Sequence, residues 1–223
     1  RHFLGPMMVR MGDADGLIGG LVHKYADTVR PALQTIGLDA KARLVAGTYM
    51  MVFKSELMFF ADPVINIDPS AQELAEIALC TAETARSFDV EPRVAMLSFS
   101  NFGSSRHPQA DKVRQATKIV QQRAPDLVVE GEMQADLALT PSMLEEAYPF
   151  AELKGRANVL VFPDLSSANV AYKLTQCLAG AEAVGPILMG FDKPVHLMPS
   201  NSTVEQIVQL TAVAVVDAQQ SSD

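Results

Sequence analysis

Strand-like and helix-like segments alternate along this chain from residue 70 onward. A capping box, Ser70 with Glu73, opens the first helix, and a second, Ser202 with Glu205, precedes the last. The expected strands are residues 94–99, 127–129, 158–162 and 183–189, and the expected helices are residues 70–88, 108–123, 168–178 and 204–216, with a short helix starting at Pro141. Such alternation predicts parallel βαβ units and an α/β fold.

The first 69 residues are less regular, with a helix expected over residues 31–36 and a strand over residues 44–53. We expect residues 1–41 plus 187–223 to form a partial first lobe and residues 42–186 to form a second α/β lobe. The strand over residues 183–189 contains Gly185-Pro186, which predicts a sheet edge or a bulge. The chain starts at Arg1 without an initiator Met, which suggests a chain entered partway through a domain.

Composition and charge exclude several classes of protein. Apolar residues make up 48% and charged residues 20%, as in globular proteins. The 26 acidic and 18 basic residues give a net charge of −8, which argues against nucleic acid as a partner. No apolar run approaches the ~20 residues that span a membrane. The two cysteines have no CxxC partner, so no metal site is expected. We therefore expect a cytoplasmic protein.

Three polar loops follow expected strands, at residues 98–107, 164–169 and 199–203. The carboxyl ends of parallel strands meet at one sheet edge, and the helix N-termini there suit an anion. Helix capping by Ser and Asn is the simpler explanation of any single loop, but three such loops at one sheet edge keep both interpretations open. The candidate ligand-binding residues are Ser100, Gly103 and Ser104 in the first loop, Asp164, Asn169, Tyr172 and Lys173 in and after the second, and Ser200 and Asn201 in the third.

An acidic segment, Glu130, Glu132 and Asp136, follows the strand expected at residues 127–129. It fits a solvated turn or a polar wall of a site equally well. No histidine has the partners of a catalytic triad, and we expect no catalytic residue.

Three strings, at residues 94–104, 131–136 and 162–174, resemble signatures of phosphate acetyltransferases, in family order. This resemblance implies a three-layer α/β/α fold with a mostly parallel sheet, like that of isocitrate and isopropylmalate dehydrogenases, truncated at its N-terminus. It also implies that Arg30 is a substrate-site arginine.

The two ends of the chain, residues 8–10 and 213–219, resemble the C-terminal domain of bacterial NADP-dependent hybrid malic enzymes. That resemblance implies a regulatory domain that senses acetyl-CoA as an effector. The malic-enzyme catalytic domains of the same polypeptide would be its partners, and only they would hold NADP and a divalent metal. A homodimer or a higher homo-oligomer is also expected.

Two positions depart from active phosphate acetyltransferases, which carry Ser-Arg-Gly before the last helix and an Asp inside it. Here the string is Pro199-Ser200-Asn201, and Gln206 stands at the Asp position. Acyl transfer needs charge stabilisation in the transition state, so we expect the domain to lack acetyltransferase activity. The alternatives are an active phosphate acetyltransferase and a purely oligomerising module.

Overall fold

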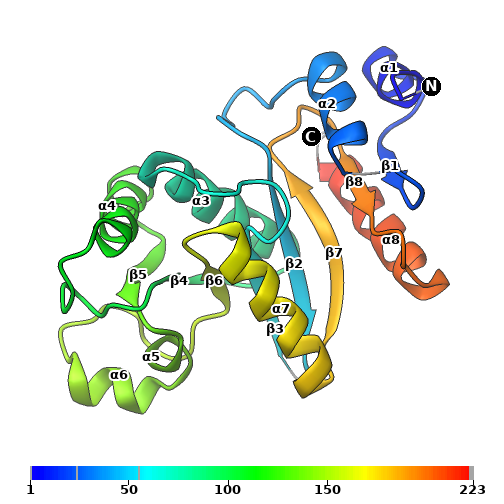
Figure 1. Ribbon diagram of the computed structural model, residues 1–223. Helices are drawn as coiled ribbons and strands as arrows, with labels where there is room; N and C mark the ends of the chain where they lie inside the picture. The colour runs from blue at the N-terminus through cyan, green and yellow to red at the C-terminus, as the bar shows by residue number, and fades with distance from the viewer. Residues whose placement is uncertain (1, 24, 55, 221–223) are drawn as a thin grey trace.

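A six-stranded sheet in the order β5-β4-β6-β3-β2-β7 is the centre of the computed structural model, which describes residues 2–23, 25–54 and 56–220 (Figure 1). Its strands are β2 (Ala46–Val52), β3 (Leu57–Ala61), β4 (Arg93–Leu97), β5 (Val128–Met133), β6 (Val159–Val161) and β7 (Glu182–Met189). The neighbours β5-β4, β4-β6 and β6-β3 are parallel, whereas β2 runs antiparallel to both β3 and β7. The expected α/β fold with a mostly parallel sheet is confirmed.

Helices cover both faces of this sheet. They are α3 (Ala71–Ser87), α4 (Pro108–Arg123), α5 (Ala135–Leu139), α6 (Pro141–Ala147) and α7 (Leu165–Ala179). Leu74 of α3 and Val113 of α4 belong to one buried cluster, and Leu137 of α5 and Tyr172 of α7 belong to another. Two separate clusters, each shared between strands and helices, give the three layers that the family resemblance implied.

The remaining elements surround a small parallel sheet of β1 (Leu17–Gly20) and β8 (Val195–Met198), which lies on the right of Figure 1. Its helices are α1 (Leu4–Met11), α2 (Tyr25–Thr35) and α8 (Val204–Gln220). The division into lobes at residues 41/42 and 186/187 stays a prediction, and β7 runs across the second of these boundaries. Arg1, where the chain was expected to enter a domain partway, lies outside the described residues.

Local capping signals place several helix ends. Ser70 Oγ accepts a hydrogen bond from the Glu73 amide at 3.3 Å, and Glu73 Oε2 accepts one from the Ser70 amide at 2.8 Å, so the first capping box is confirmed. The second lies one residue later than predicted. Gln206 Oε1 accepts from the Thr203 amide at 3.0 Å, and Thr203 Oγ1 accepts from the Gln206 amide at 3.2 Å. The side chain of Gln206 is therefore engaged in starting α8.

The strand β7 is an edge strand, as its Gly-Pro pair predicted, and its register with β2 shifts between Thr48 and Met50. Gly185 has a φ of +139°, and a Cβ there would lie 3.0 Å from the carbonyl oxygen of Thr48 and 3.1 Å from Cδ1 of Tyr49. A side chain at residue 185 would thus displace β2 and Tyr49. No helix in the described part of the chain is long and apolar enough to cross a bilayer.

Candidate functional site

A cavity of about 350 Å³ lies where α7 meets β2, β7 and the segment that leads into α8. Pro63 and Val64, which follow the carboxyl end of β3, line it together with residues of α7, the helix that follows β6. Ligands of α/β sheets bind beyond the carboxyl ends of the strands, and small-molecule sites measure about 300–1,000 Å³. The position and size of this cavity therefore make it the candidate ligand site.

Four of the residues predicted from the sequence line this cavity: Asn169, Tyr172, Lys173 and Asn201. Lys173 is the one cationic side chain among the described lining residues, and no Asp, Glu or His is among them. Its ammonium nitrogen lies 5.0 Å from the centre of the Tyr172 ring, within the range of a cation–π contact. A positive charge without a lining carboxylate favours an anionic ligand.

Three other predicted residues do not line the cavity. Arg30 is exposed on α2, and Ser200 is exposed although its two neighbours in the chain line the cavity. Asp164 caps α7, where its Oδ1 accepts a hydrogen bond from the Ser167 amide at 2.8 Å. A ligand-binding role for these three residues stays a prediction.

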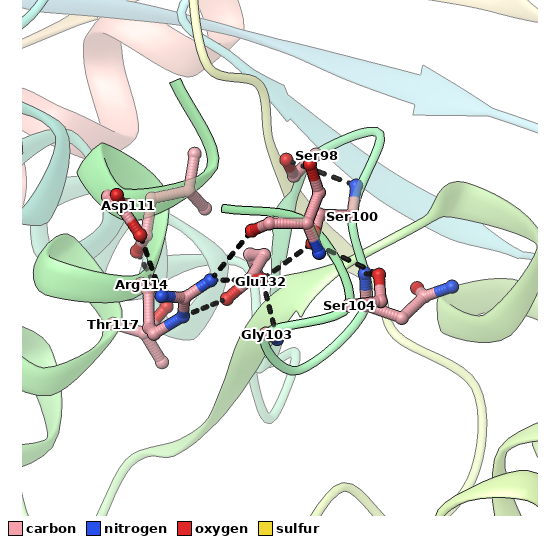
Figure 2. A network of polar contacts seen from close by, with 11 residues as sticks. Ser98, Ser100, Gly103, Ser104, Asp111, Arg114, Thr117 and Glu132 are labelled. Carbon is pink, nitrogen blue, oxygen red and sulfur yellow. Dashed lines mark hydrogen bonds and ion pairs between the residues drawn. The ribbon is translucent and has the colours of Figure 1, made fainter. Parts of the chain in front are cut away.

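The first polar loop is closed on a carboxylate of the protein itself (Figure 2). The Ser100 hydroxyl and the Gly103 amide donate to Glu132 Oε1 at 2.9 Å and 2.8 Å, and the hydroxyls of Ser100 and Ser104 lie 3.2 Å apart. Two of the donors expected for an anion are thus engaged internally, and none of these three residues lines the cavity.

Glu132 itself is fully buried and is paired with Arg114 of α4. Arg114 donates through Nε at 2.9 Å and Nη2 at 3.0 Å, and its Nη1 donates to Asp111 at 2.7 Å. Burial alone would raise the pKa of Glu132, but the hydrogen bonds from Arg114, Gly103 and Ser100 outweigh burial and hold this pKa below its usual value. Glu132 lies inside β5. At this residue, the acidic segment is therefore neither a solvated turn nor a wall of the cavity.

Sequence reasoning missed two tyrosines that line the cavity beside Tyr172. Tyr49 of β2 is 4% exposed and stacks on Tyr172, with ring centres 4.4 Å apart and an angle of 21° between the planes. Tyr25 comes from α2 and lines the same cavity. Burial raises the pKa of both Tyr25 and Tyr49, so these hydroxyls keep their protons at neutral pH. No local pattern marks these tyrosines, because only the tertiary fold brings them together.

The turn after β3 is fixed against the candidate site. The buried carboxylate of Asp62 accepts hydrogen bonds from the amides of Val64 at 2.9 Å and Asn66 at 3.0 Å. The amide nitrogen of the Asn169 side chain donates to the carbonyl oxygen of Pro63 at 3.1 Å. Asn169 therefore holds Pro63 in place in the cavity wall, and this structural role does not depend on a bound ligand.

A larger cavity, of about 470 Å³, lies between α3 and α8. Cys80 lines it, but burial raises the pKa of this thiol to about 12, so it is not a ready nucleophile at neutral pH. None of the residues predicted for ligand binding lines this cavity. We therefore place the candidate site in the smaller one.

Comparisons with known proteins identify the family to which this fold belongs. The family model described as Phosphate acetyl/butaryl transferase matches residues 1–215. A phosphate acetyltransferase of Bacillus subtilis is 45% identical over 217 residues, which cover 97% of this chain and 67% of the relative. One of Deinococcus radiodurans is 42% identical over 98% of this chain, but the match spans 31% of that relative.

Solved structures give the same fold. A phosphotransacetylase from Streptococcus pyogenes has a TM-score of 0.92 and 47% identity, covering 99% of this chain and 67% of its own. A branched-chain phosphotransacylase from Enterococcus faecalis V583 has a TM-score of 0.80 at 20% identity, covering 97% of this chain and 78% of its own, and this likeness concerns the fold alone.

These comparisons overturn the expectation drawn from the two chain ends. We expected an acetyl-CoA-sensing regulatory domain of an NADP-dependent malic enzyme, which is an oxidoreductase, and we expected this domain to lack acetyltransferase activity. That expectation is wrong, because relatives that match across the chain at 45% and 42% identity carry the name phosphate acetyltransferase. The terminal strings at residues 8–10 and 213–219 comprise few residues, and the departures at Ser200 and Gln206 are two positions among 217 aligned. A resemblance spread over the whole fold outweighs both.

Proposed function

The chain belongs to the phosphate acetyl/butaryl transferase family, and from this premise we propose that it transfers an acyl group between an acyl phosphate and coenzyme A. The observation that carries the proposal is the cavity at the carboxyl edge of the sheet, where Lys173 is the lining cation and no lining carboxylate opposes an anion among the described residues. The match to a phosphate acetyltransferase of Bacillus subtilis at 45% identity supports the same activity.

In this proposal the phosphate group lies beside Lys173, and amides such as that of Asn201 donate to its oxygens. A cavity of about 350 Å³ is at the small end of the range for ligand sites, so it fits the reacting end of coenzyme A with a small acyl phosphate. Such a site works mainly by holding the two reactants in position for attack.

The reaction itself needs no further co-reactant. The sulfur of coenzyme A attacks the carbonyl carbon of the acyl phosphate, forming the C–S bond. The C–O bond to phosphate then breaks, and its electron pair leaves with the phosphate, which takes up the thiol proton. No Asp, Glu or His lines the described part of the cavity, so its residues contribute position and charge rather than a general base.

Two positions bear on the rate. Ser200 and Gln206 stand where the family resemblance implies an arginine and an aspartate, and Gln206 already bonds to the Thr203 amide. Without an arginine at position 200, Lys173 has to supply more of the charge that stabilises the leaving phosphate. We therefore expect slower transfer than in a site that holds both groups.

The experiment is to incubate the whole chain with acetyl phosphate and coenzyme A and to follow the absorbance of the new thioester. We expect acetyl-CoA to form, and Lys173→Ala to lower kcat/KM by about a hundredfold. Lys118→Ala is the matched control, because Lys118 is exposed on α4 and does not line the cavity. A folded chain that forms no acetyl-CoA, or a Lys173→Ala variant as active as Lys118→Ala, would show that the proposal is wrong.

We also propose that the chain works as a homodimer or a higher homo-oligomer. Val204, Val208 and Val215 are 77%, 63% and 52% exposed at helical spacing along α8, and such an apolar stripe favours burial against another copy. Light scattering tests this assembly. A cytoplasmic location stays a prediction.

A further inference from the structure

The side-chain amide of Asn169 lies at the candidate cavity in a fixed orientation. Asn169 belongs to α7 and lines the cavity, and its Nδ2 donates to the carbonyl oxygen of Pro63 at 3.1 Å. Turning this amide over would set Oδ1 against the carbonyl oxygen, with two acceptors facing each other, so the nitrogen stays on the Pro63 side. The structure therefore fixes where this side chain holds its N–H groups.

The carbonyl group that orients Asn169 is itself held firmly. Pro63 is buried, and it follows Asp62, whose buried carboxylate accepts hydrogen bonds from the amides of Val64 at 2.9 Å and Asn66 at 3.0 Å. These bonds close the turn around Pro63. A donor that is anchored to such a turn does not have to reorganise when a substrate binds, which is the condition for stabilising a transition state.

A count of hydrogens on this one nitrogen shows what it offers to a ligand. A side-chain amide nitrogen carries two hydrogens. The bond to Pro63 uses one of the hydrogens on Asn169 Nδ2, and the other has no partner in the part of the chain that the structure describes. Because both hydrogens belong to the same nitrogen, the donor that remains is at Asn169, which is half-buried in the cavity wall.

Lys173 lies four residues after Asn169 on α7 and lines the same cavity. Residues at this spacing share one face of a helix and are about 6 Å apart along its axis. This face therefore offers a neutral donor one turn before a cation. An acyl phosphate has oxygens that match both groups. Its phosphate is charged from the start, whereas its carbonyl oxygen gains charge only when a nucleophile adds, so a neutral donor there favours the transition state over the substrate.

We propose that Asn169 is a catalytic residue, whose second Nδ2 hydrogen is donated to the carbonyl oxygen of the acyl phosphate. The substrate class rests on the proposed function. As the sulfur of coenzyme A forms the C–S bond, the second electron pair of the C=O bond moves onto the oxygen, where Asn169 donates to it. That pair returns when the C–O bond to phosphate breaks, and the phosphate leaves with the electrons of that bond and takes up the thiol proton.

The first test is the rate of acetyl-CoA formation by the whole chain. Asn169→Leu keeps the branched shape of the side chain and removes the donor, so we expect kcat to fall about a hundredfold. Asn66→Leu is the matched control. It also loses an amide group of the same turn, where Asn66 Nδ2 donates to Asp62 Oδ2 at 2.6 Å, but Asn66 does not line the cavity. The control should lose far less rate, and equal losses would show that Asn169 only supports the turn.

The second test is the carbonyl stretching band of bound acetyl phosphate, which reports the hydrogen bond itself. We would record infrared difference spectra with acetyl phosphate that is isotope-labelled at its carbonyl carbon, without coenzyme A, so that no transfer occurs. The band should move to higher frequency in Asn169→Leu and stay in place in Asn66→Leu. Inorganic phosphate has no carbonyl group, so its Kd should be the same for Asn169→Leu as for the unaltered chain. An unchanged band in Asn169→Leu overturns the inference.

Asn169→Asp decides the matter if Asn169→Leu does not fold. It keeps the shape of the side chain but has no N–H at neutral pH, so kcat should fall as well, and an unchanged kcat refutes the inference.

The proposed function and the role of Asn169 fail differently. A chain whose carbonyl band depends on Asn169 but that forms no acetyl-CoA refutes the proposed function alone. A chain that forms acetyl-CoA with the same kcat in Asn169→Leu refutes the role of Asn169 alone. An unaltered chain that does not bind acetyl phosphate refutes both.

Discussion

Replacing Arg114 by methionine removes the guanidinium hydrogen bonds that hold Glu132, the fully buried carboxylate behind the first polar loop. Methionine keeps much of the volume of arginine and leaves the Ser100 and Gly103 donors in place. Breaking a buried ion pair by removing one partner costs about 3–5 kcal/mol, because the remaining charge is left buried without its counterion. The side chain of Arg114 is 29% exposed, which moves the expected loss to the lower end, about 3 kcal/mol.

The assay is equilibrium unfolding in urea at neutral pH, with Arg10→Met as the matched control. Arg10 pairs with Asp192 at 3.2 Å, but these side chains are 58% and 38% exposed. Exposed pairs contribute about 0–1 kcal/mol, so the control should unfold close to the unaltered chain. A loss in Arg114→Met no larger than in Arg10→Met would refute the reasoning that Glu132 depends on this pair.

The pH dependence provides a second check with a definite sign. The pKa of Glu132 is lowered in the folded chain, so its stabilisation is present above the unfolded pKa and is lost as the pH falls through the folded pKa. In Arg114→Met the buried Glu132 loses its counterion, and its pKa rises, so it takes up a proton at a higher pH. The difference in unfolding free energy between the two chains should therefore shrink as the pH falls toward and below about 4.3, the ordinary value for glutamate. A difference that stays constant or grows in acid would contradict this assignment.

Two further predictions concern the cavity. Ser200→Arg places a guanidinium beside the lining residues Pro199 and Asn201, and it should lower the calorimetric Kd for acetyl phosphate about tenfold, whereas Gln115→Arg, an exposed residue of α4 with the same added charge, should not. Gly185→Ala combines a φ of +139° with contacts of 3.0 Å and 3.1 Å, so thermal unfolding should show a loss of about 2–3 kcal/mol. The control Gly155→Ala meets no atom within 4 Å at a φ of +84° and should cost about 1–2 kcal/mol, and equal losses would contradict the packing role of Gly185.

Local chemistry made much of the fold predictable from the sequence. The helix α4 spans Pro108–Arg123 as predicted, because Pro108 is favoured in the first turn and the His107 side chain accepts from the Gln109 amide at 3.2 Å. The strand β3 was missed, since five consecutive apolar residues do not distinguish a strand from a buried helix segment. The second capping box was misplaced by one residue, because Ser202 and Thr203 are both good caps and only the backbone decides between them.

The candidate site likewise contains residues that local sequence rules predicted and residues that they missed. Asn169, Tyr172 and Lys173 follow a strand within one helix, so a rule about strand ends was enough to find them. Tyr25 and Tyr49 are brought to that helix by contacts across more than a hundred residues, which no periodicity encodes. The partner of Glu132 is likewise remote from its own strand, since Arg114 belongs to α4.

The polar loops at the carboxyl edge differ in what already satisfies their donors. A carboxylate of the protein, Glu132, accepts from the Ser100 hydroxyl and the Gly103 amide, and its charge is matched by Arg114. An external phosphate at that loop would have to displace a buried ion pair, which costs several kcal/mol before any contact with the phosphate forms. At the opposite end of the edge, Lys173 has no carboxylate among the described residues that line its cavity, so an anion that binds there need not break an ion pair with a lining residue. Of the two loops compared, we therefore expect an anion to bind more readily in the cavity beside α7, where no described lining residue carries an opposing charge, than at the loop closed on Glu132.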